Sequence, residues 1–178
     1  MTTTLTALAD PAALAVLVHG TSEALAACPG AATVRPRVTA HLVGDTNTEV
    51  SITAGNHAFT IDEPAALGGE DTGASPVEHL LAALGACQVI SFKVWAAKLG
   101  IEIDEVAVDL AGDIDLRGFF GVGPDVRPGF GSIEVAVRLS GPESRETYAE
   151  LVRQVEAHCP VLDNLTAGLP VTTSVTVA

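Results

Sequence analysis

Residues 75–87 read SPVEHLLAALGAC, and they contain the clearest helix signal in the sequence. Ser75 and Glu78 have the spacing of a capping box, in which a hydroxyl and a carboxylate satisfy the first free backbone N–H groups of a helix. Gly100 is a typical stop, so the helix is predicted to end just before it. Because residues 80–92 are apolar on almost every side, we expect this helix to be central rather than on the surface.

Upstream of this helix, apolar residues recur among Thr, Ser and His between residues 33 and 61. Turn signals at residues 44–47 and 55–56 divide the stretch into shorter pieces. We therefore predict a meander of three short strands, followed by a Gly-rich loop over residues 63–74.

Downstream, residues 102–112 are predicted to form a strand, and residues 115–131 a long loop rich in Gly and Phe. Residues 132–139 alternate strictly between apolar and polar, which indicates a half-buried strand. A second helix is predicted over residues 143–158, and a last strand over residues 171–177.

The predicted order βββ-α-ββ-α-β indicates an α+β fold, in which two helices cover one face of antiparallel sheet. Residues 4–27 are also predicted to be helical, with Asp10-Pro11 as the cap and Cys28-Pro29-Gly30 as the stop. We accordingly expect an N-terminal helical extension over residues 1–32 and a main domain over residues 33–178.

The chain carries a formal net charge of −13 and 48% hydrophobic residues, which is enough apolar material for a core. Such an acidic protein has no row of cations for phosphates or for an anionic bilayer, so we expect neither a nucleic-acid nor a membrane partner. Its three cysteines lack CxxC spacing and are too few for a disulfide scaffold. No metal site is expected, since ligands would have to come from scattered positions.

The N-terminus contains LAAC at residues 25–28, which resembles a lipoprotein cleavage box. No Lys or Arg precedes Arg35, however, and a secretory signal needs a positive start. Residues 77–95 are long and apolar enough to suggest a membrane span, but they contain Glu78, His79, Gln88 and Lys93. We therefore expect a cytoplasmic protein whose long helix is buried in protein.

Two cysteines occupy positions that packing will fix. Cys87 lies in the middle of the long helix, and Cys159 ends the second helix, directly before Pro160. A thiol at a helix terminus has room to swing toward a partner. The alternative is that each Cys is simply a small buried hydrophobe.

The stretch SPVEHLLAALGAC at residues 75–87 resembles the signature helix of the OsmC/Ohr family (osmotically inducible protein / organic hydroperoxide resistance protein). HCPVLDNL at residues 158–165 resembles the family's second cysteine segment. The resemblance covers residues 34–177 and includes the deduced order of strands and helices, which implies an OsmC-like fold.

The resemblance implies a peroxiredoxin-like thiol peroxidase that reduces organic hydroperoxides in oxidative-stress defence. Cys87 would attack the peroxide and become a sulfenic acid, and Cys159 would condense with it to a disulfide. An external thiol would then reduce that disulfide. Glu78 matches the carboxylate of the family's site, and no cofactor or metal is implied.

Glu78 and Cys87 lie nine residues apart, which on a straight helix is about 13.5 Å of rise and about half a turn. They do not touch within one helix. If both serve one site, Glu78 of one subunit must approach Cys87 of another, so we expect a homodimer with active sites at the interface. The resemblance also implies a tight dimer. The alternative role for Glu78 is the capping box alone.

Ohr-type members carry an arginine in the loop between the first two strands, but here residues 44–48 contain no basic residue. Arg35 and Arg37, just upstream, are the nearest substitutes for stabilising a thiolate, and His79 is a further candidate. The absent arginine favours two alternatives: a non-catalytic dimer that binds an apolar small molecule, or a redox sensor. The retained Cys pair favours the enzyme.

The loop over residues 115–131 leaves two roles open for Phe119, Phe120 and Phe130. The rings either wall a hydrophobic pocket for an apolar substrate or anchor the long loop to the core.

Overall fold

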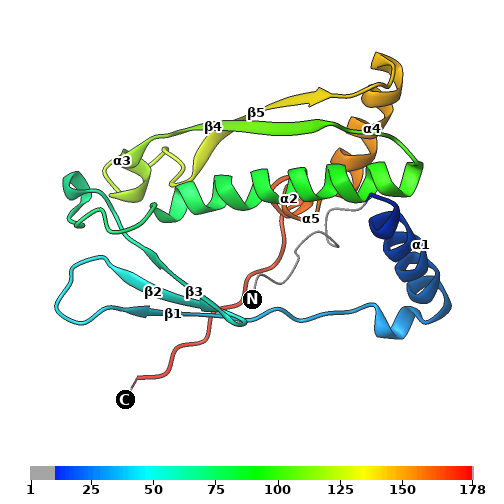
Figure 1. Ribbon diagram of the computed structural model, residues 1–178. Coiled ribbons are helices and arrows are strands. Elements are labelled where there is room, and N and C mark those ends of the chain that lie inside the picture. Colours follow the sequence, from blue (N-terminus) through cyan, green and yellow to red (C-terminus); the bar gives the residue numbers. More distant parts are fainter. Residues whose placement is uncertain (1–10, 178) are drawn as a thin grey trace, which may run out of the picture. The chain divides into compact units, whose positions relative to one another are not determined.

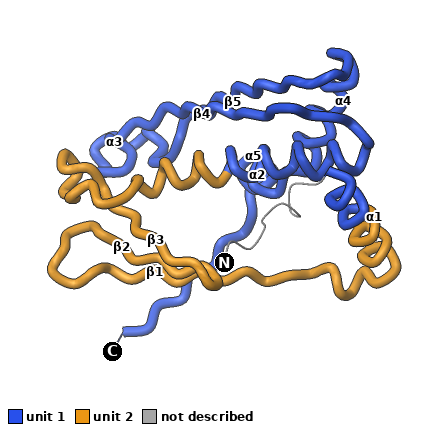
Figure 2. The backbone as a smooth tube through the Cα atoms, in the orientation of Figure 1, with its two compact units in different colours: residues 1–18, 84–178 blue, residues 19–83 orange. Residues whose placement is uncertain are grey.

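The computed structural model describes residues 11–177. The described residues form two compact units, residues 11–18 with 84–177 and residues 19–83 (Figure 2). A three-stranded antiparallel sheet lies in the second of these units, and a two-stranded one lies in the first.

The sheet of residues 19–83 consists of β1 (Val38–Leu42), β2 (Val50–Ala54) and β3 (His57–Ile61), paired in that order (Figure 1). A two-residue turn joins β2 to β3, and its Gly55 has a φ of +59°, which glycine adopts without a Cβ clash. The predicted meander of three strands is confirmed. The prediction was right because the alternation of apolar residues and the turn signals mark the same three strands.

Asp62 follows β3 and ties the loops of this unit together. Its side chain is 1% exposed and accepts hydrogen bonds from Thr48 Oγ1 at 2.6 Å, from Glu70 N at 2.8 Å and from Thr72 N at 3.3 Å. These donors, with the Thr48 hydroxyl first, hold the pKa of Asp62 well below its usual range. The loop between β1 and β2 is therefore fixed to the segment that contains η3 (Ala65–Leu67).

The long helix α2 (Pro76–Leu99) begins and ends where the sequence predicts. At its start the Ser75 amide and hydroxyl both donate to Glu78 Oε2 at 2.7 Å, as a capping box requires. At its end Gly100 takes a φ of +69° and the following amide bonds back to the carbonyl of Ala96.

Only one face of α2 is enclosed, which differs from the expectation of a helix covered all round. Ile90 is 63% exposed, whereas Leu84 and Phe92 are 1% exposed. The reason is that a single chain supplies protein to one side of the helix only. By length and composition alone α2 also meets the requirements of a membrane span, with a mean hydropathy of 1.6.

In the larger unit, β4 (Glu105–Ile114) pairs antiparallel with β5 (Phe130–Ser140). Helix α4 (Arg145–His158) and the second half of α2 cover one face of this hairpin (Figure 1). The core between these layers contains Phe92, Ala96, Leu151 and Val155, with partly buried residues of β4 and β5 against it. Two helices on one face of antiparallel sheet is the predicted α+β arrangement.

Helix and sheet approach each other closely at Gly85. A Cβ placed on this glycine would lie 2.7 Å from the Leu110 side chain of β4. Glycine at this position therefore lets α2 pack directly on the strand, two residues before Cys87.

Three local differences from the sequence prediction occur in this unit. Helix α5 (Pro160–Ala167) differs from the predicted end of the helical region, because Cys159-Pro160 is typical of a stop although Pro is also favoured in the first turn of a helix. Residues 171–177 were predicted as a strand but form none, since they have no neighbouring strand in the described part of this chain. The connection 115–131 is shorter than predicted, because it contains α3 (Leu116–Phe119).

The N-terminal helix α1 (Pro11–Ala27) has no buried residue and is followed by the short turn η2 (Pro29–Ala31). The predicted stop at residues 28–30 agrees with this end. Asp10 and the rest of the predicted helix before Pro11 lie outside the described residues.

Candidate functional site

Cys87 and Cys159 are 72 residues apart in sequence, yet their sulfur atoms lie 3.3 Å apart. Cys87 lies in the middle of α2, and Cys159 lies at the junction of α4 and α5. A disulfide needs a sulfur–sulfur distance of about 2.05 Å, so the two atoms must approach by only about 1.3 Å to bond.

The two thiols differ in exposure. Cys159 is 0% exposed, whereas Cys87 is partly exposed. Burial raises the pKa of the Cys159 thiol, although the backbone N–H of Leu162 opposes this by donating to its sulfur. Cys159 therefore keeps its proton and donates it in a hydrogen bond to the sulfur of Cys87. The accessible sulfur is the acceptor, which is the arrangement that a nucleophilic Cys87 requires.

Two helices hold the backbone of Cys159 from both sides. It is the last cap of α4 and the first cap of α5, and Pro160 occupies the first helical position after it. A swing of this thiol, as expected for a helix terminus, is not needed to reach Cys87, because the sulfurs are already within 3.3 Å.

Glu78 and His79 are engaged with their own helix start. The Ser75 hydroxyl and amide hold the pKa of the Glu78 carboxyl below its usual value. His79 Nδ1 lies 3.1 Å from the carbonyl oxygen of Ser75, and its ring stacks on Phe59 with 5.3 Å between centroids. These contacts lie within residues 19–83, and they fix the start of α2.

The sequence matches the family model "OsmC-like protein" over residues 68–174, which is more than half of the chain. The chain belongs to the OsmC family. Both cysteines of the pair lie within the matched residues. No curated protein matches the sequence.

Solved structures show the same fold as this OsmC-family protein. An OsmC-like protein from Mycoplasma pneumoniae is 20% identical, with a TM-score of 0.64 over 76% of this chain and 89% of that one. An organic hydroperoxide resistance protein OsmC from Legionella pneumophila is 21% identical, with a TM-score of 0.57 over 76% and 91%. The organic hydroperoxide resistance protein OhrB of Bacillus subtilis is 26% identical, with a TM-score of 0.51 over 76% and 93%.

The loop between β1 and β2 has no basic residue, and hydrogen bonds hold it in place in this OsmC-family protein. Thr46 donates to the carbonyl of Val43 at 2.8 Å, Asn47 to that of Gly68 at 3.2 Å, and Thr48 to Asp62. This loop therefore has a structural role.

Arg35 and Arg37 are exposed residues of the segment that leads into β1. Elsewhere Arg117 is held by both carboxylate oxygens of Asp115. Among residues 11–177, no hydrogen bond joins a basic side chain to the Cys87 sulfur. Within the same range, no three His, Cys, Asp or Glu side chains are grouped as a metal site would require.

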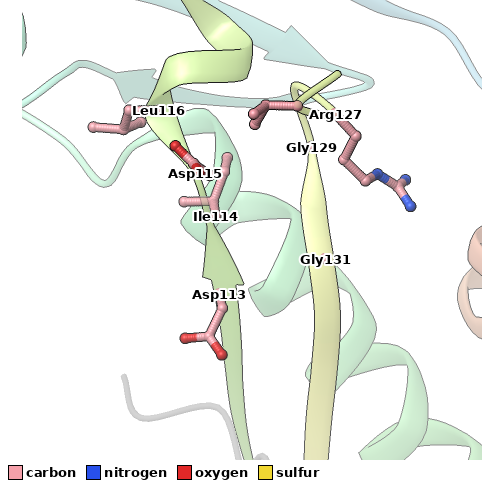
Figure 3. Close-up of a pocket in the computed structure, with 8 residues that line it drawn as sticks. Asp113, Ile114, Asp115, Leu116, Arg127, Gly129 and Gly131 are labelled. Carbon is pink, nitrogen blue, oxygen red and sulfur yellow. The ribbon is translucent and has the colours of Figure 1, made fainter. Parts of the chain in front are cut away.

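An open pocket of about 660 Å³ lies where β4 ends and β5 begins (Figure 3). Its lining includes Asp113, Asp115 and Arg127 beside apolar side chains. The Phe rings of the connection do not line it. Phe130 packs across Gly112, and Phe119 is 66% exposed. Phe130 thus anchors the loop, one of the two roles left open from sequence.

An aromatic contact beside the Cys pair was not found from sequence. The ring of His158, the residue before Cys159, lies 4.3 Å from the ring of Trp95 on α2. Lys98 Nζ lies 4.4 Å from the centroid of the same Trp ring. The only signals in the sequence are the adjacency of His158 to Cys159 and the eight-residue spacing of Trp95 from Cys87, and neither indicates that the two helices meet there.

Proposed function

We propose that this protein is a thiol-dependent peroxidase that reduces organic hydroperoxides. The observation that carries the proposal is the 3.3 Å distance between the sulfur atoms of Cys87 and Cys159. Reacting atoms about 3–3.5 Å apart are in a near-attack geometry. Membership of the OsmC family and the names of two similar structures, which refer to organic hydroperoxide resistance, support the peroxide as substrate.

In the proposed reaction the Cys87 thiolate attacks one peroxide oxygen. A sulfur–oxygen bond forms, the O–O bond breaks, and the alcohol leaves after taking a proton, so Cys87 becomes a sulfenic acid. The sulfur of Cys159 then attacks that of Cys87, a disulfide forms, and the hydroxyl leaves with the Cys159 proton as water. An external dithiol restores both thiols by exchange and is itself oxidised.

The order of the two cysteines follows from their exposure. A bulky hydroperoxide needs a sulfur that it can approach from solvent, and Cys87 is partly exposed whereas Cys159 is fully enclosed. The buried, protonated thiol is suited to the second step, in which its only partner is a neighbour 3.3 Å away. We accordingly propose Cys87 as the attacking residue and Cys159 as the resolving residue.

We further propose that the protein is a cytoplasmic homodimer and that Glu78 acts across its interface. Ala83, Ala86 and Ile90 are all exposed, and their spacing of three and four residues places them on one side of α2. A second copy of this helix would cover that apolar stripe. The same pairing would bring Glu78 of one subunit toward Cys87 of the other.

The test compares wild type with Cys87→Ser and Cys28→Ser in the consumption of cumene hydroperoxide with dihydrolipoamide. Cys28 is an exposed free thiol outside the pair, which makes its variant a matched control. We expect Cys28→Ser to retain the wild-type rate and Cys87→Ser to lose turnover. Equal rates in all three proteins would overturn the proposal. A disulfide that forms once and is never recycled by any dithiol would instead identify a redox sensor.

A further inference from the structure

Disulfide formation in the proposed cycle depends on where Cys159 is held. The sulfurs must close from 3.3 Å to about 2.05 Å, and a displacement of about 1 Å in such a reaction costs up to about a hundredfold in rate. The chain therefore needs contacts that fix the α4–α5 junction against α2.

The residue next to Cys159 makes such a contact. His158 is the last residue of α4, and its Nδ1 lies 2.8 Å from the carbonyl oxygen of Gln154, which fixes the ring. That ring lies 4.3 Å from Trp95, tilted by 37°. The exposed His side chain thus connects the backbone adjacent to one sulfur with the helix that carries the other.

Trp95 is itself held firmly. It packs against the core formed by Phe92, Ala96, Leu151 and Val155, and the Lys98 ammonium lies over its ring. Trp95 and Cys87 share the continuous helix α2, eight residues or about 12 Å of rise apart. The end of α4 therefore rests on a well-packed part of the helix that carries Cys87, and this contact opposes a displacement of Cys159 relative to Cys87.

We propose that Trp95 and His158 form a brace that holds the Cys159 sulfur opposite Cys87, which makes both of them positioning residues for disulfide formation. The inference rests on the proposed function and names two further residues for its second step. The brace acts on the resolution step alone, because the attack of Cys87 on the peroxide does not involve Cys159.

The experiment mixes reduced protein with a stoichiometric amount of cumene hydroperoxide and follows two products over time. A sulfenic-acid-specific reagent reports attack by Cys87, and mass spectrometry after thiol alkylation reports the Cys87–Cys159 disulfide. We expect His158→Ala to form the sulfenic acid at the wild-type rate but the disulfide about tenfold or more slowly. His158→Phe, which keeps a ring on Trp95, is expected to recover most of the rate, and His19→Ala on α1 is the matched control.

Trp95→Ala and Trp95→Phe form the second pair of variants. We expect Trp95→Ala to slow disulfide formation as His158→Ala does, and Trp95→Phe to recover most of the rate. Since Trp95 borders the core, His158→Ala keeps the test decisive if Trp95→Ala fails to fold. Wild-type disulfide rates in His158→Ala would overturn the brace while leaving the peroxidase intact. Absence of both the sulfenic acid and the disulfide in the wild type would instead overturn the proposed function.

Discussion

At the scale of single residues, the proton on Cys159 separates the two halves of the proposed reaction. Burial raises the pKa of this thiol, so at neutral pH it is a hydrogen-bond donor and not a competing nucleophile. The same proton must leave before a disulfide forms. The first step thus gains from a protonated Cys159, and the second step is slowed by it.

We therefore expect the rate of disulfide formation to rise as the pH is raised above neutrality, since the deprotonated fraction of a thiol grows until the pH passes its raised pKa. Quenched samples of wild type mixed with a stoichiometric amount of cumene hydroperoxide measure this rate. Cys159→Ser supplies the control, because it performs one turnover and leaves a trapped sulfenic acid whose formation reports the first step alone. A disulfide rate that does not change with pH would contradict this role of the buried thiol.

At the scale of secondary-structure elements, the start of α2 depends on the capping box. Ser75 is 7% exposed and donates twice to Glu78, and the Glu78 amide returns a longer bond of 3.4 Å to the Ser75 hydroxyl. Donation from Ser75 lowers the pKa of Glu78, so the cap is complete whenever this carboxyl is ionised.

We expect Ser75→Ala to lower the free energy of unfolding by about 1 kcal/mol, the usual cost of a lost N-cap. Because the folded pKa of Glu78 is below its unfolded value, the stabilisation is present at neutral pH and is lost as the pH falls through the folded pKa. Urea unfolding of wild type and Ser75→Ala at neutral and acidic pH measures both effects. Ser75→Thr, which retains a capping hydroxyl, is the control. Equal midpoints at neutral pH would show that the cap is dispensable.

At the scale of the whole molecule, Glu78 of one subunit is proposed to act at the Cys87 site of the other subunit. Nine residues of helix separate the two side chains by about 13.5 Å along the axis, so their cooperation in one chain is excluded by length. A dimer in which two α2 helices pair around a twofold axis would create two equivalent sites.

Mixing two inactive variants distinguishes the subunit that provides Glu78. If it acts across the interface, a dimer of one Cys87→Ser chain and one Glu78→Gln chain retains one intact site. After random exchange from equal amounts, about a quarter of the wild-type activity is then expected. If Glu78 acts only on its own helix start, mixing gives no recovery. The measured quantities are peroxide consumption and, by light scattering, the mass of the particle.

Much of this fold follows from local patterns in the sequence. The capping box, the stop at Gly100 and the alternation in β5 each specify their element through neighbouring residues, and the structure confirms them. Helix α5 was missed because Pro160 is compatible both with the end of one helix and with the start of the next. Residues 171–177 alternate like a strand, but alternation alone supplies no neighbouring strand to pair with.

The candidate site, like the fold, could be predicted only in part from the sequence. The motif around each cysteine was visible in the sequence, and so was the absence of a basic residue between β1 and β2. The contact of Trp95 with His158 was not visible, because it depends on how two helices far apart in sequence cross each other. Periodicity specifies which face of a helix is buried, and it does not specify which residue of another helix lies against that face.

The position of Cys159 between α4 and α5 has a consequence for signalling. Since the sulfurs already lie 3.3 Å apart, the chain is expected to exchange its thiol pair for a disulfide without unwinding either helix. The oxidised and reduced forms would then present nearly identical surfaces to other macromolecules. A protein whose two oxidation states look alike from outside carries little information about them, and its conformation is suited to repeated turnover rather than to reporting the redox balance of the cell.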